Sequence, residues 1–80
     1  MIDDKLKQEI LAHAKQCKPQ ESCGFVVFDG QQNIYIPCVN VSSDPINYFE
    51  IAPEEFIAAE GIGHIVALVH SHPDSAEEKG

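Results

Sequence analysis

The sequence is poor in basic residues, with five lysines and arginines against 13 aspartates and glutamates and a net charge of -8 at pH 7. Such a charge repels both the phosphate backbone of nucleic acids and an anionic membrane surface. The chain also lacks an apolar run of the roughly 18 to 20 residues that cross a bilayer, and its first ten residues lack the apolar stretch of a signal peptide. We therefore expect a cytoplasmic protein that binds neither nucleic acid nor membrane.

Cysteine is scarce as well. Cys17, Cys23 and Cys38 are odd in number and form no C-x-x-C pair. This spacing argues against a disulfide framework and against a four-sulfur zinc site. We expect reduced thiols, with Cys17 and Cys38 in the core.

The length of 80 residues predicts one domain, residues 1–80, because a second fold would have no chain left to bury. A domain of this size removes only about 60% of its unfolded surface from water, so its stability should be marginal. The 44% hydrophobic content argues for a folded domain and against a disordered one. After Pro73 only Ala76 is apolar, so we expect the chain to be a fragment of a longer protein.

The first half predicts a helix followed by a β-hairpin. The helix runs from Asp3 to about Cys17 and stops before Pro19, which cannot continue the hydrogen-bond ladder. Its core-facing residues, at spacings of three and four, are Leu6, Ile10, Leu11 and Ala14. A strand from Cys23 to Phe28 reaches a turn at Asp29-Gly30 and returns as a strand from Asn33 to about Val41. Pro37 lacks an N–H donor and favours a place at a sheet edge.

The second half predicts a short helix and a buried strand. Tyr48 to Ile51 suits a further short strand, and Pro53 suits the first position of a helix that ends at Gly61. Its predicted core residues are Phe56, Ile57 and Ala59. The unbroken apolar run Ile65 to Val69 is typical of a central strand buried on both faces. The predicted fold is α+β, a mixed or antiparallel sheet flanked by two helices.

The most informative stretch is H-S-H-P, which follows the apolar run and contains His70 and His72. If the strand continues through it, both imidazoles project from one face at the strand's end. Imidazole nitrogen is a zinc ligand, although a catalytic zinc typically has three protein ligands and one open position. Two histidines alone also occur as surface pairs or capping donors. The other histidines, His13 and His64, are expected to be ordinary structural residues.

Glu21 precedes the first predicted strand, where a connector from helix to strand can deliver a carboxylate to the end of the sheet. A glutamate in a polar loop is ordinarily solvated. Beside a zinc-activated water, however, a carboxylate serves as a general base. Glu21 therefore gives the histidine pair a chemical partner.

Together these residues resemble the JAMM (JAB/MPN) metallopeptidase domain. The similar segments are Glu21 within P-Q-E-S-C-G-F-V-V, the strand that leads into H-S-H-P, and the stretches P-C-V-N and F-E-I-A-P-E-E-F. The resemblance covers essentially the whole chain and is greatest to the phage branch, in tail assembly proteins of the lambda K type. It implies a JAB/MPN-like core of the cytidine-deaminase type, Zn²⁺ held by His70 and His72, and a water polarised by Glu21.

The resemblance also implies an activity and a setting. The activity is hydrolysis of an amide or isopeptide bond in a peptide or protein substrate, and other phage tail proteins are the implied partners. The implied location is the cytoplasm of a bacterial host cell or the virion tail. The family pattern continues to a serine eight residues after the second histidine and to an aspartate three residues further on. Here Gly80 occupies the eighth position and ends the chain, so the third zinc ligand and that serine have no counterpart.

The acidic residues after Pro73, which are Asp74, Glu77 and Glu78, are expected to be solvated. We therefore expect these 80 residues to bind zinc weakly and to have little or no activity. Two other functions stay open. Cys23 with His70 or His72 as its base would form a thiol peptidase, although a cysteine that begins an apolar strand favours a buried thiol. A metal-free domain could instead act as a structural assembly module of the tail, but such a scaffold needs neither the glutamate nor the histidines.

Overall fold

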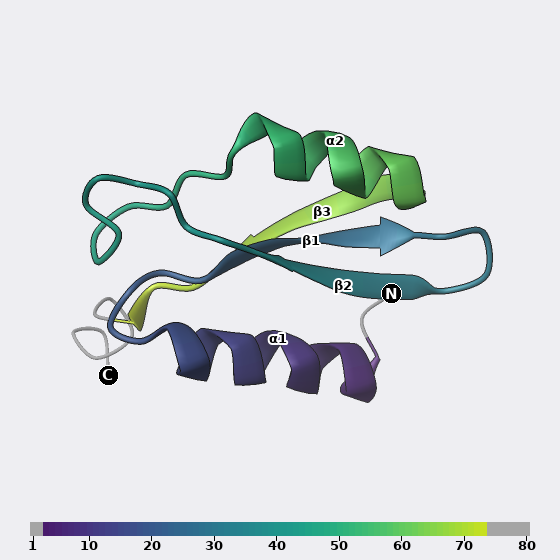
Figure 1. Ribbon diagram of the computed structural model, residues 1–80. Coiled ribbons are helices and arrows are strands. Elements are labelled where there is room, and N and C mark those ends of the chain that lie inside the picture. Colours follow the sequence, from purple (N-terminus) through teal and green to yellow (C-terminus); the bar gives the residue numbers. More distant parts are fainter. Residues whose placement is uncertain (1–2, 74–80) are drawn as a thin grey trace.

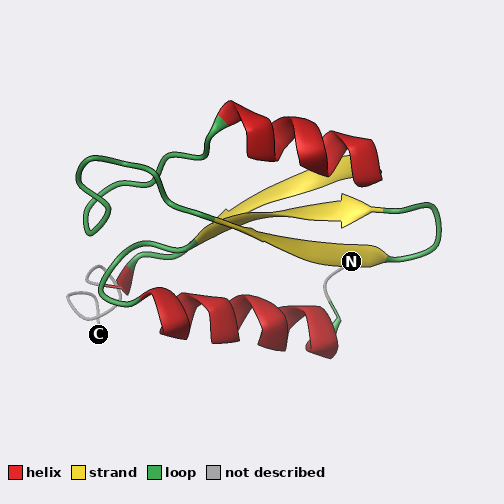
Figure 2. Cartoon of the chain, viewed as in Figure 1, coloured by secondary structure: helices red, strands yellow, loops and turns green. Residues whose placement is uncertain are grey.

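Two helices cover opposite faces of a three-stranded sheet in the computed structural model, which describes residues 3–73 (Figure 1). In chain order the elements are α1 (Asp4–Cys17), β1 (Cys23–Phe28), β2 (Asn33–Cys38), α2 (Pro53–Ile62) and β3 (His64–His70). Figure 2 shows the sheet between the two helices. The predicted α+β class is therefore confirmed. Neither α1 nor α2 has the length and apolar character needed to cross a membrane.

Helix α1 begins and ends where its sequence directs. The Asp3 carboxylate accepts a hydrogen bond from the Leu6 N–H at 2.8 Å, which satisfies one of the unpaired donors of the first turn. The helix ends at Cys17, before Pro19. Leu6 is buried against the sheet and Ile10 is half-buried, but Leu11 is exposed. The prediction for Leu11 is wrong because a helix turns by about 100° per residue, which carries Leu11 away from the face that holds Ile10.

The hairpin of β1 and β2 is confirmed, with Cys23 paired to Cys38 and Phe28 paired to Asn33. Gly30 has a φ of 104°, a conformation that a residue with a side chain rarely adopts. Strand β2 ends at Cys38, three residues before the predicted end at Val41. It lies at an edge of the sheet, as Pro37 predicts.

The strand order is β2-β1-β3, and both pairings are antiparallel, so β1 is the central strand. The prediction that Ile65 to Val69 form a central strand is wrong. Within residues 3–73, β3 pairs with β1 alone, and the side chains of Val66 and Leu68 are 39% and 51% exposed. An apolar run records how hydrophobic a strand is, but the number of its neighbours depends on the rest of the chain.

Helix α2 begins at Pro53 and ends at Ile62, one residue beyond the predicted end. Ala59 faces the sheet and is fully buried. Ile57 is exposed, which contradicts its predicted place in the core. It lies two residues before Ala59, and two residues along a helix correspond to a rotation of about 200°, so the two side chains point to opposite sides. Phe56 is 45% exposed, which also contradicts its predicted place in the core, although its ring meets that of Phe25 edge-on with centroids 5.8 Å apart.

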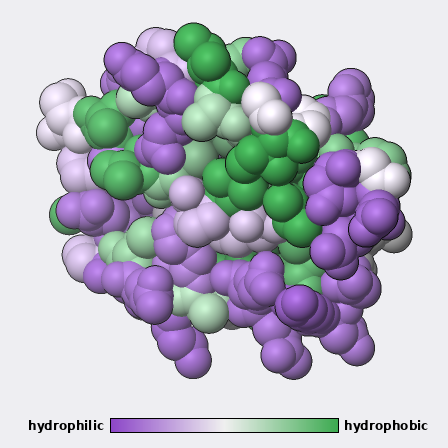
Figure 3. Space-filling view, turned by 45° about the vertical axis from the view of Figure 1, so that its right-hand side comes forward, coloured by the Kyte–Doolittle hydropathy of each residue, from purple (hydrophilic) through white to green (hydrophobic). Residues whose placement is uncertain are grey.

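The segment from Tyr48 to Ile51 is irregular and forms no strand, which corrects the prediction for it. Phe49 and Ile51 nevertheless pack against the core on the α2 face of the sheet. That face buries Cys23, Phe25, Val27, Cys38 and Ala59, whereas the α1 face buries Leu6, Val26 and Tyr35. Cys38 therefore lies in the core as predicted, whereas Cys17 is only partly buried. Some apolar side chains also reach the surface, where they gather into a patch among hydrophilic ones (Figure 3).

Candidate metal centre

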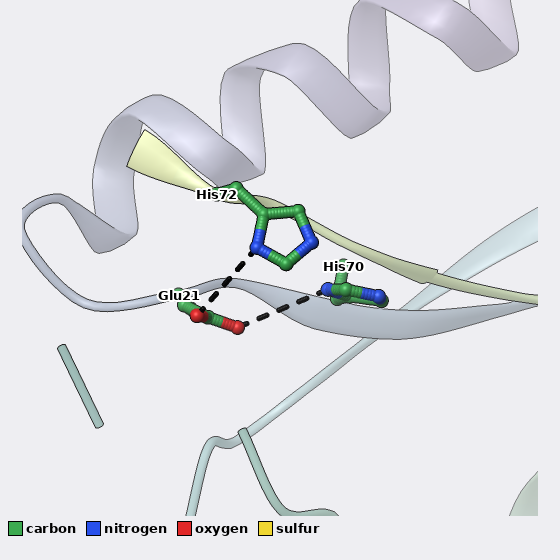
Figure 4. A group of neighbouring side chains, drawn as sticks. All are labelled: Glu21, His70 and His72. Carbon is green, nitrogen blue, oxygen red and sulfur yellow. Dashed lines mark ion pairs between the residues drawn. The ribbon is translucent and has the colours of Figure 1, made fainter. Parts of the chain in front are cut away.

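Three side chains converge at one end of the sheet: Glu21, His70 and His72 (Figure 4). Glu21 Oε1 lies 3.8 Å from His70 Nδ1, and Glu21 Oε2 lies 3.8 Å from His72 Nδ1. The two imidazole rings meet nearly at right angles, with centroids 4.5 Å apart. One potential ligand atom from each residue lies within 4.8 Å of the other two. The structure thus brings together the three residues that were singled out in the sequence.

The antiparallel pairing of β1 with β3 explains this meeting. Cys23, the first residue of β1, is paired with His70, the last residue of β3. Residues just before β1 therefore lie opposite residues just after β3, which places Glu21 beside the H-S-H stretch. The expectation that both imidazoles project from one face of a strand required the strand to continue to His72. The strand ends at His70 instead. The two imidazoles still approach the same carboxylate.

Ser71 joins the two segments that carry the three side chains. Its Oγ accepts a hydrogen bond from the Ser22 N–H at 2.9 Å, and its own N–H donates to the Ser22 carbonyl oxygen at 3.1 Å. Both main-chain polar groups of Ser22, which is buried next to Glu21, are thereby satisfied. Ser71 was not among the candidate site residues predicted from the sequence. The available signal was a small hydroxyl residue at the only position between two candidate ligands.

The site is buried on its acidic side and open on its imidazole side. The Glu21 side chain is 7% exposed, whereas those of His70 and His72 are 31% and 56% exposed. Taking a carboxylate out of water is costly unless it is paired or coordinates a metal. Within residues 3–73, the ion-pair partners of Glu21 are these two imidazoles. The arrangement thus keeps a buried carboxyl group beside two imidazoles that remain accessible to solvent.

Phe49 forms an apolar wall beside the site. Its ring stacks on the His70 imidazole, with centroids 4.4 Å apart and planes inclined by 22°. Such a stack restricts rotation of the imidazole. Phe49 comes from the irregular segment between β2 and α2, and sequence reasoning gave it no place in the site. Phe49 is the first residue of the F-E-I-A-P-E-E-F stretch. This stretch contributed to the family resemblance, but none of its residues was assigned a role in the site from the sequence.

The donor set suits a divalent metal ion. Imidazole nitrogen and carboxylate oxygen are common zinc ligands, and tetrahedral ligands about 2.1 Å from zinc stand roughly 3.4 Å apart. One nitrogen of each imidazole and one Glu21 oxygen lie within 4.8 Å of one another, so an ion held by the two imidazoles would lie beside the carboxylate. Asp74, Glu77 and Glu78, the other carboxylates considered from the sequence, lie outside the described residues.

The structure does not support the thiol-peptidase alternative. Cys23 is fully buried in the core, and burial raises the pKa of its thiol to about 11. A nucleophilic cysteine needs an accessible thiolate near neutral pH, which is the opposite environment. His13 lies elsewhere, with Nδ1 2.8 Å from the Tyr35 hydroxyl, and burial lowers its pKa. His64 is exposed at the start of β3. Neither of these histidines belongs to the site.

Comparison with known proteins agrees with the resemblance seen in the sequence. The family model for prokaryotic homologs of the JAB domain matches residues 3–78. Tail tip assembly protein K of Escherichia phage N15 is 44% identical over 69 residues, which make up 86% of this chain and 28% of that protein. The chain thus spans less than a third of the length of this relative. No solved structure gives a significant match. The chain belongs to the family of prokaryotic homologs of the JAB domain.

Proposed function

We propose that this domain is a zinc-dependent peptidase or isopeptidase that acts in the assembly of a phage tail. One observation carries the proposal: a buried carboxylate, Glu21, faces two solvent-accessible imidazoles across 3.8 Å. Burying an acid against two histidines costs desolvation energy and is weak evidence of a stabilising role, so a structural role alone does not account for the arrangement. Membership of the JAB family supports this interpretation.

His70 and His72 are the residues that would hold the metal ion, through their ring nitrogens. When bound, zinc supplies Lewis acidity, which polarises a carbonyl group and lowers the pKa of water towards about 7. Glu21 acts as the general base that removes a proton from the attacking water and then passes it to the leaving nitrogen. Burial helps Glu21 in this role, because its oxygens are turned towards the imidazoles and away from bulk solvent.

Affinity for zinc should be modest. If Glu21 is the base, the described residues supply two protein ligands, one fewer than the usual three of a catalytic zinc. The third ligand is then expected from an aspartate beyond Gly80 in a longer chain. Activity is correspondingly expected to be low in the 80 residues alone.

The setting of the proposed reaction comes from the tail tip assembly protein of phage N15. We propose that the partners of this domain are other tail proteins, and that its substrate is a peptide or protein among them. The proposed place of action is the host cytoplasm during assembly or the virion tail itself.

A second candidate function is that of a non-catalytic assembly module. Large apolar side chains are exposed on α2 and β3, namely Phe56, Ile57, Ile62, Val66 and Leu68. Phe56 and Leu68 line one hollow of the surface, and exposed apolar surface that is contiguous often marks a protein interface. Such a module would not require Glu21, His70 or His72, so substitution of these three residues separates the two functions.

Calorimetric titration with Zn²⁺ and assay of peptide cleavage by mass spectrometry test the proposal. The variants are Glu21→Gln and His70→Ala, with His64→Ala as a control in an exposed histidine outside the site. We expect His70→Ala to weaken zinc binding by at least tenfold, since it removes a ligand, and His64→Ala to leave it unchanged. Glu21→Gln should bind zinc within a fewfold of the unsubstituted chain. In a longer chain that supplies the third ligand, its cleavage of a mixture of blocked peptides should fall by about 10² or more.

Three results would contradict the proposal. Equal loss of zinc affinity in Glu21→Gln and His70→Ala would make Glu21 a ligand and remove it as the base. Undiminished cleavage by Glu21→Gln would also show that Glu21 is not the general base. Absence of zinc binding at about 100 μM metal by a longer chain that supplies the third ligand would favour the assembly module.

A further inference from the structure

Asn40 lies two residues after the end of β2, and its side chain is the centre of a hydrogen-bond network. Its Nδ2 carries two N–H donors and lies within hydrogen-bond distance of three carbonyl oxygens, those of Glu21 at 2.9 Å, Tyr48 at 3.0 Å and Pro45 at 3.2 Å, so one N–H is shared between two of them. Its Oδ1 accepts from two N–H groups, those of Ser42 at 3.0 Å and Glu50 at 3.2 Å. The asparagine amide offers two N–H donors and an acceptor oxygen at once. Aspartate and leucine have a similar shape but lack these donors, so neither can replace it.

This network attaches the main chain of Glu21 to the segment 39–52. The Glu21 carbonyl oxygen accepts from Asn40, and the Glu21 N–H donates to the Pro45 carbonyl oxygen at 2.8 Å. Both main-chain polar groups of Glu21 are therefore held by one segment, just as both groups of Ser22 are held by Ser71. The backbone on which the buried carboxylate stands is thus fixed from two sides.

The same side chain also fixes the wall beside His70. Asn40 bonds to the main chain of Tyr48 and of Glu50, the two residues that flank Phe49. Phe49 in turn stacks on the His70 ring. The segment 48–51 has no strand partner among the described residues. Its main chain is held by the bonds to Asn40 and by the Val41 N–H, which donates to the Glu50 carbonyl oxygen at 2.9 Å. One amide therefore connects the Glu21 backbone to the ring that holds an imidazole in position.

We propose that Asn40 is a positioning residue that sets the Glu21 carboxylate relative to the His70 imidazole, an inference that rests on the proposed function. Asn40 acts through Glu21 and Phe49 and contacts neither metal nor substrate. Catalysis and metal binding are sensitive to such placement, because a displacement of about 1 Å can cost about 10²-fold in rate. Loss of the amide should therefore reduce site function more than it reduces the stability of the fold.

The test compares Asn40→Ala and Asn40→Asp with two controls in the full 80-residue chain. Asn47→Ala removes another amide of the same segment, one that is exposed and bonds to the Asp44 carboxylate at 3.3 and 3.2 Å. Ile10→Ala removes apolar contact on the α1 face, away from the site, and supplies a variant of reduced stability. All measurements are made at temperatures at which each variant is folded by circular dichroism.

Three readouts report on the site. The first is zinc affinity, the second is the absorption spectrum of bound Co²⁺, and the third is the ring-current shift that Phe49 produces on the His70 ring protons in the metal-free protein. In Asn40→Ala we expect at least tenfold weaker zinc binding, an altered Co²⁺ spectrum and loss of the ring-current shift. Asn40→Asp should change them in the same direction, because its side chain cannot donate to the three carbonyls. Both controls should retain all three properties.

The proposal is overturned if Asn40→Ala keeps the ring-current shift of the unsubstituted chain, or if Ile10→Ala loses it to the same extent. This readout requires no metal, so it distinguishes failure of the positioning role from failure of the proposed function. If a longer chain that supplies the third ligand binds no zinc but Asn40→Ala alone loses the shift, the zinc hydrolase is wrong and Asn40 still positions the cluster.

Discussion

The two ends of the sheet are held together in different ways. At the hairpin end, the Asp29 carboxylate accepts hydrogen bonds from the N–H groups of Gln31 and Gln32, two and three residues away. At the other end, Ser22 and Ser71 bond across 49 residues, and Asn40 bonds to Glu21 across 19. The turn is therefore stabilised by its own neighbours, whereas the site is stabilised by segments that are distant in the sequence.

This difference connects the site to folding. A turn such as that at Asp29 can form within a short segment, because little chain entropy is lost in closing it. The cluster of Glu21, His70 and His72 exists only after β3 has paired with β1 and the segment 39–52 has docked. Changes at the hairpin end should therefore alter stability and leave the site intact. Changes at the site end should alter both.

The largest expected effect tests the comparison at the hairpin end, because a contact between residues that are distant in the sequence also lies there. A Cβ added at Gly63 would collide with the carbonyl group of Phe28, the last residue of β1. Backbone atoms in a paired strand cannot give way easily, so we expect Gly63→Ala to lower the free energy of unfolding by about 3 kcal/mol. Urea denaturation followed by circular dichroism measures this loss.

Gly61→Ala is the matched control, because a Cβ at Gly61 meets nothing within 4 Å and the residue lies within α2. We expect it to stabilise the protein by about 0.5 to 1 kcal/mol through helix propensity. Equal free energies of unfolding for Gly63→Ala and Gly61→Ala would contradict this prediction, because they would show that a Cβ at Gly63 does not collide with β1.

The next effect sharpens the comparison at the site end. Ser71→Ala removes the acceptor of the Ser22 N–H and leaves that donor buried without its partner. We expect a loss of about 2 kcal/mol in the free energy of unfolding, within the usual cost of an unsatisfied buried group. Zinc affinity should fall as well, since Ser71 holds the Glu21 segment beside both histidines. Thermal denaturation and calorimetric titration give the two quantities.

Ser43→Ala serves as its control, because Ser43 is exposed in the segment between β2 and α2. It should change neither quantity measurably. If Ser71→Ala loses stability but binds zinc as tightly as the unsubstituted chain, the hydrogen bonds between Ser22 and Ser71 stabilise the fold without positioning the metal site.

The sequence predicted best what is determined locally. The start of α1 near Asp3, its end before Pro19 and the turn at Asp29-Gly30 each depend on a few neighbouring residues. The place of Ile65 to Val69 was predicted wrongly because the number of strand neighbours is a property of the whole sheet. Tyr48 to Ile51 suited a strand by composition, but no strand of the described chain pairs with it.

The candidate site shows the same division. Glu21, His70 and His72 were expected together because their residue types and their positions relative to two strands resemble a known pattern. Their supporting residues, Ser71 and Asn40, were missed. Ser71 stands between the two histidines and Asn40 ends the P-C-V-N stretch, but each acts through a hydrogen bond to main chain far away in the sequence. The sequence does not indicate which main-chain group a serine or an asparagine will bond to.

The smallest expected effect lies in the turn itself and depends on pH. The hydrogen bonds from Gln32 and then Gln31 lower the pKa of Asp29 from its ordinary value of 3.8. Because the folded pKa lies below the unfolded one, the stabilisation is fully present above pH 3.8 and is lost as the pH falls through the folded pKa. Asp29→Ala should therefore be less stable than the unsubstituted chain at neutral pH, and this difference should shrink in acid. Urea denaturation at a series of pH values measures it, with Gly61→Ala as a control that carries no titrating group. A difference that stays constant down to about pH 2 would mean that the charge of Asp29 contributes nothing and that the turn is held by backbone conformation alone, through the positive φ of Gly30.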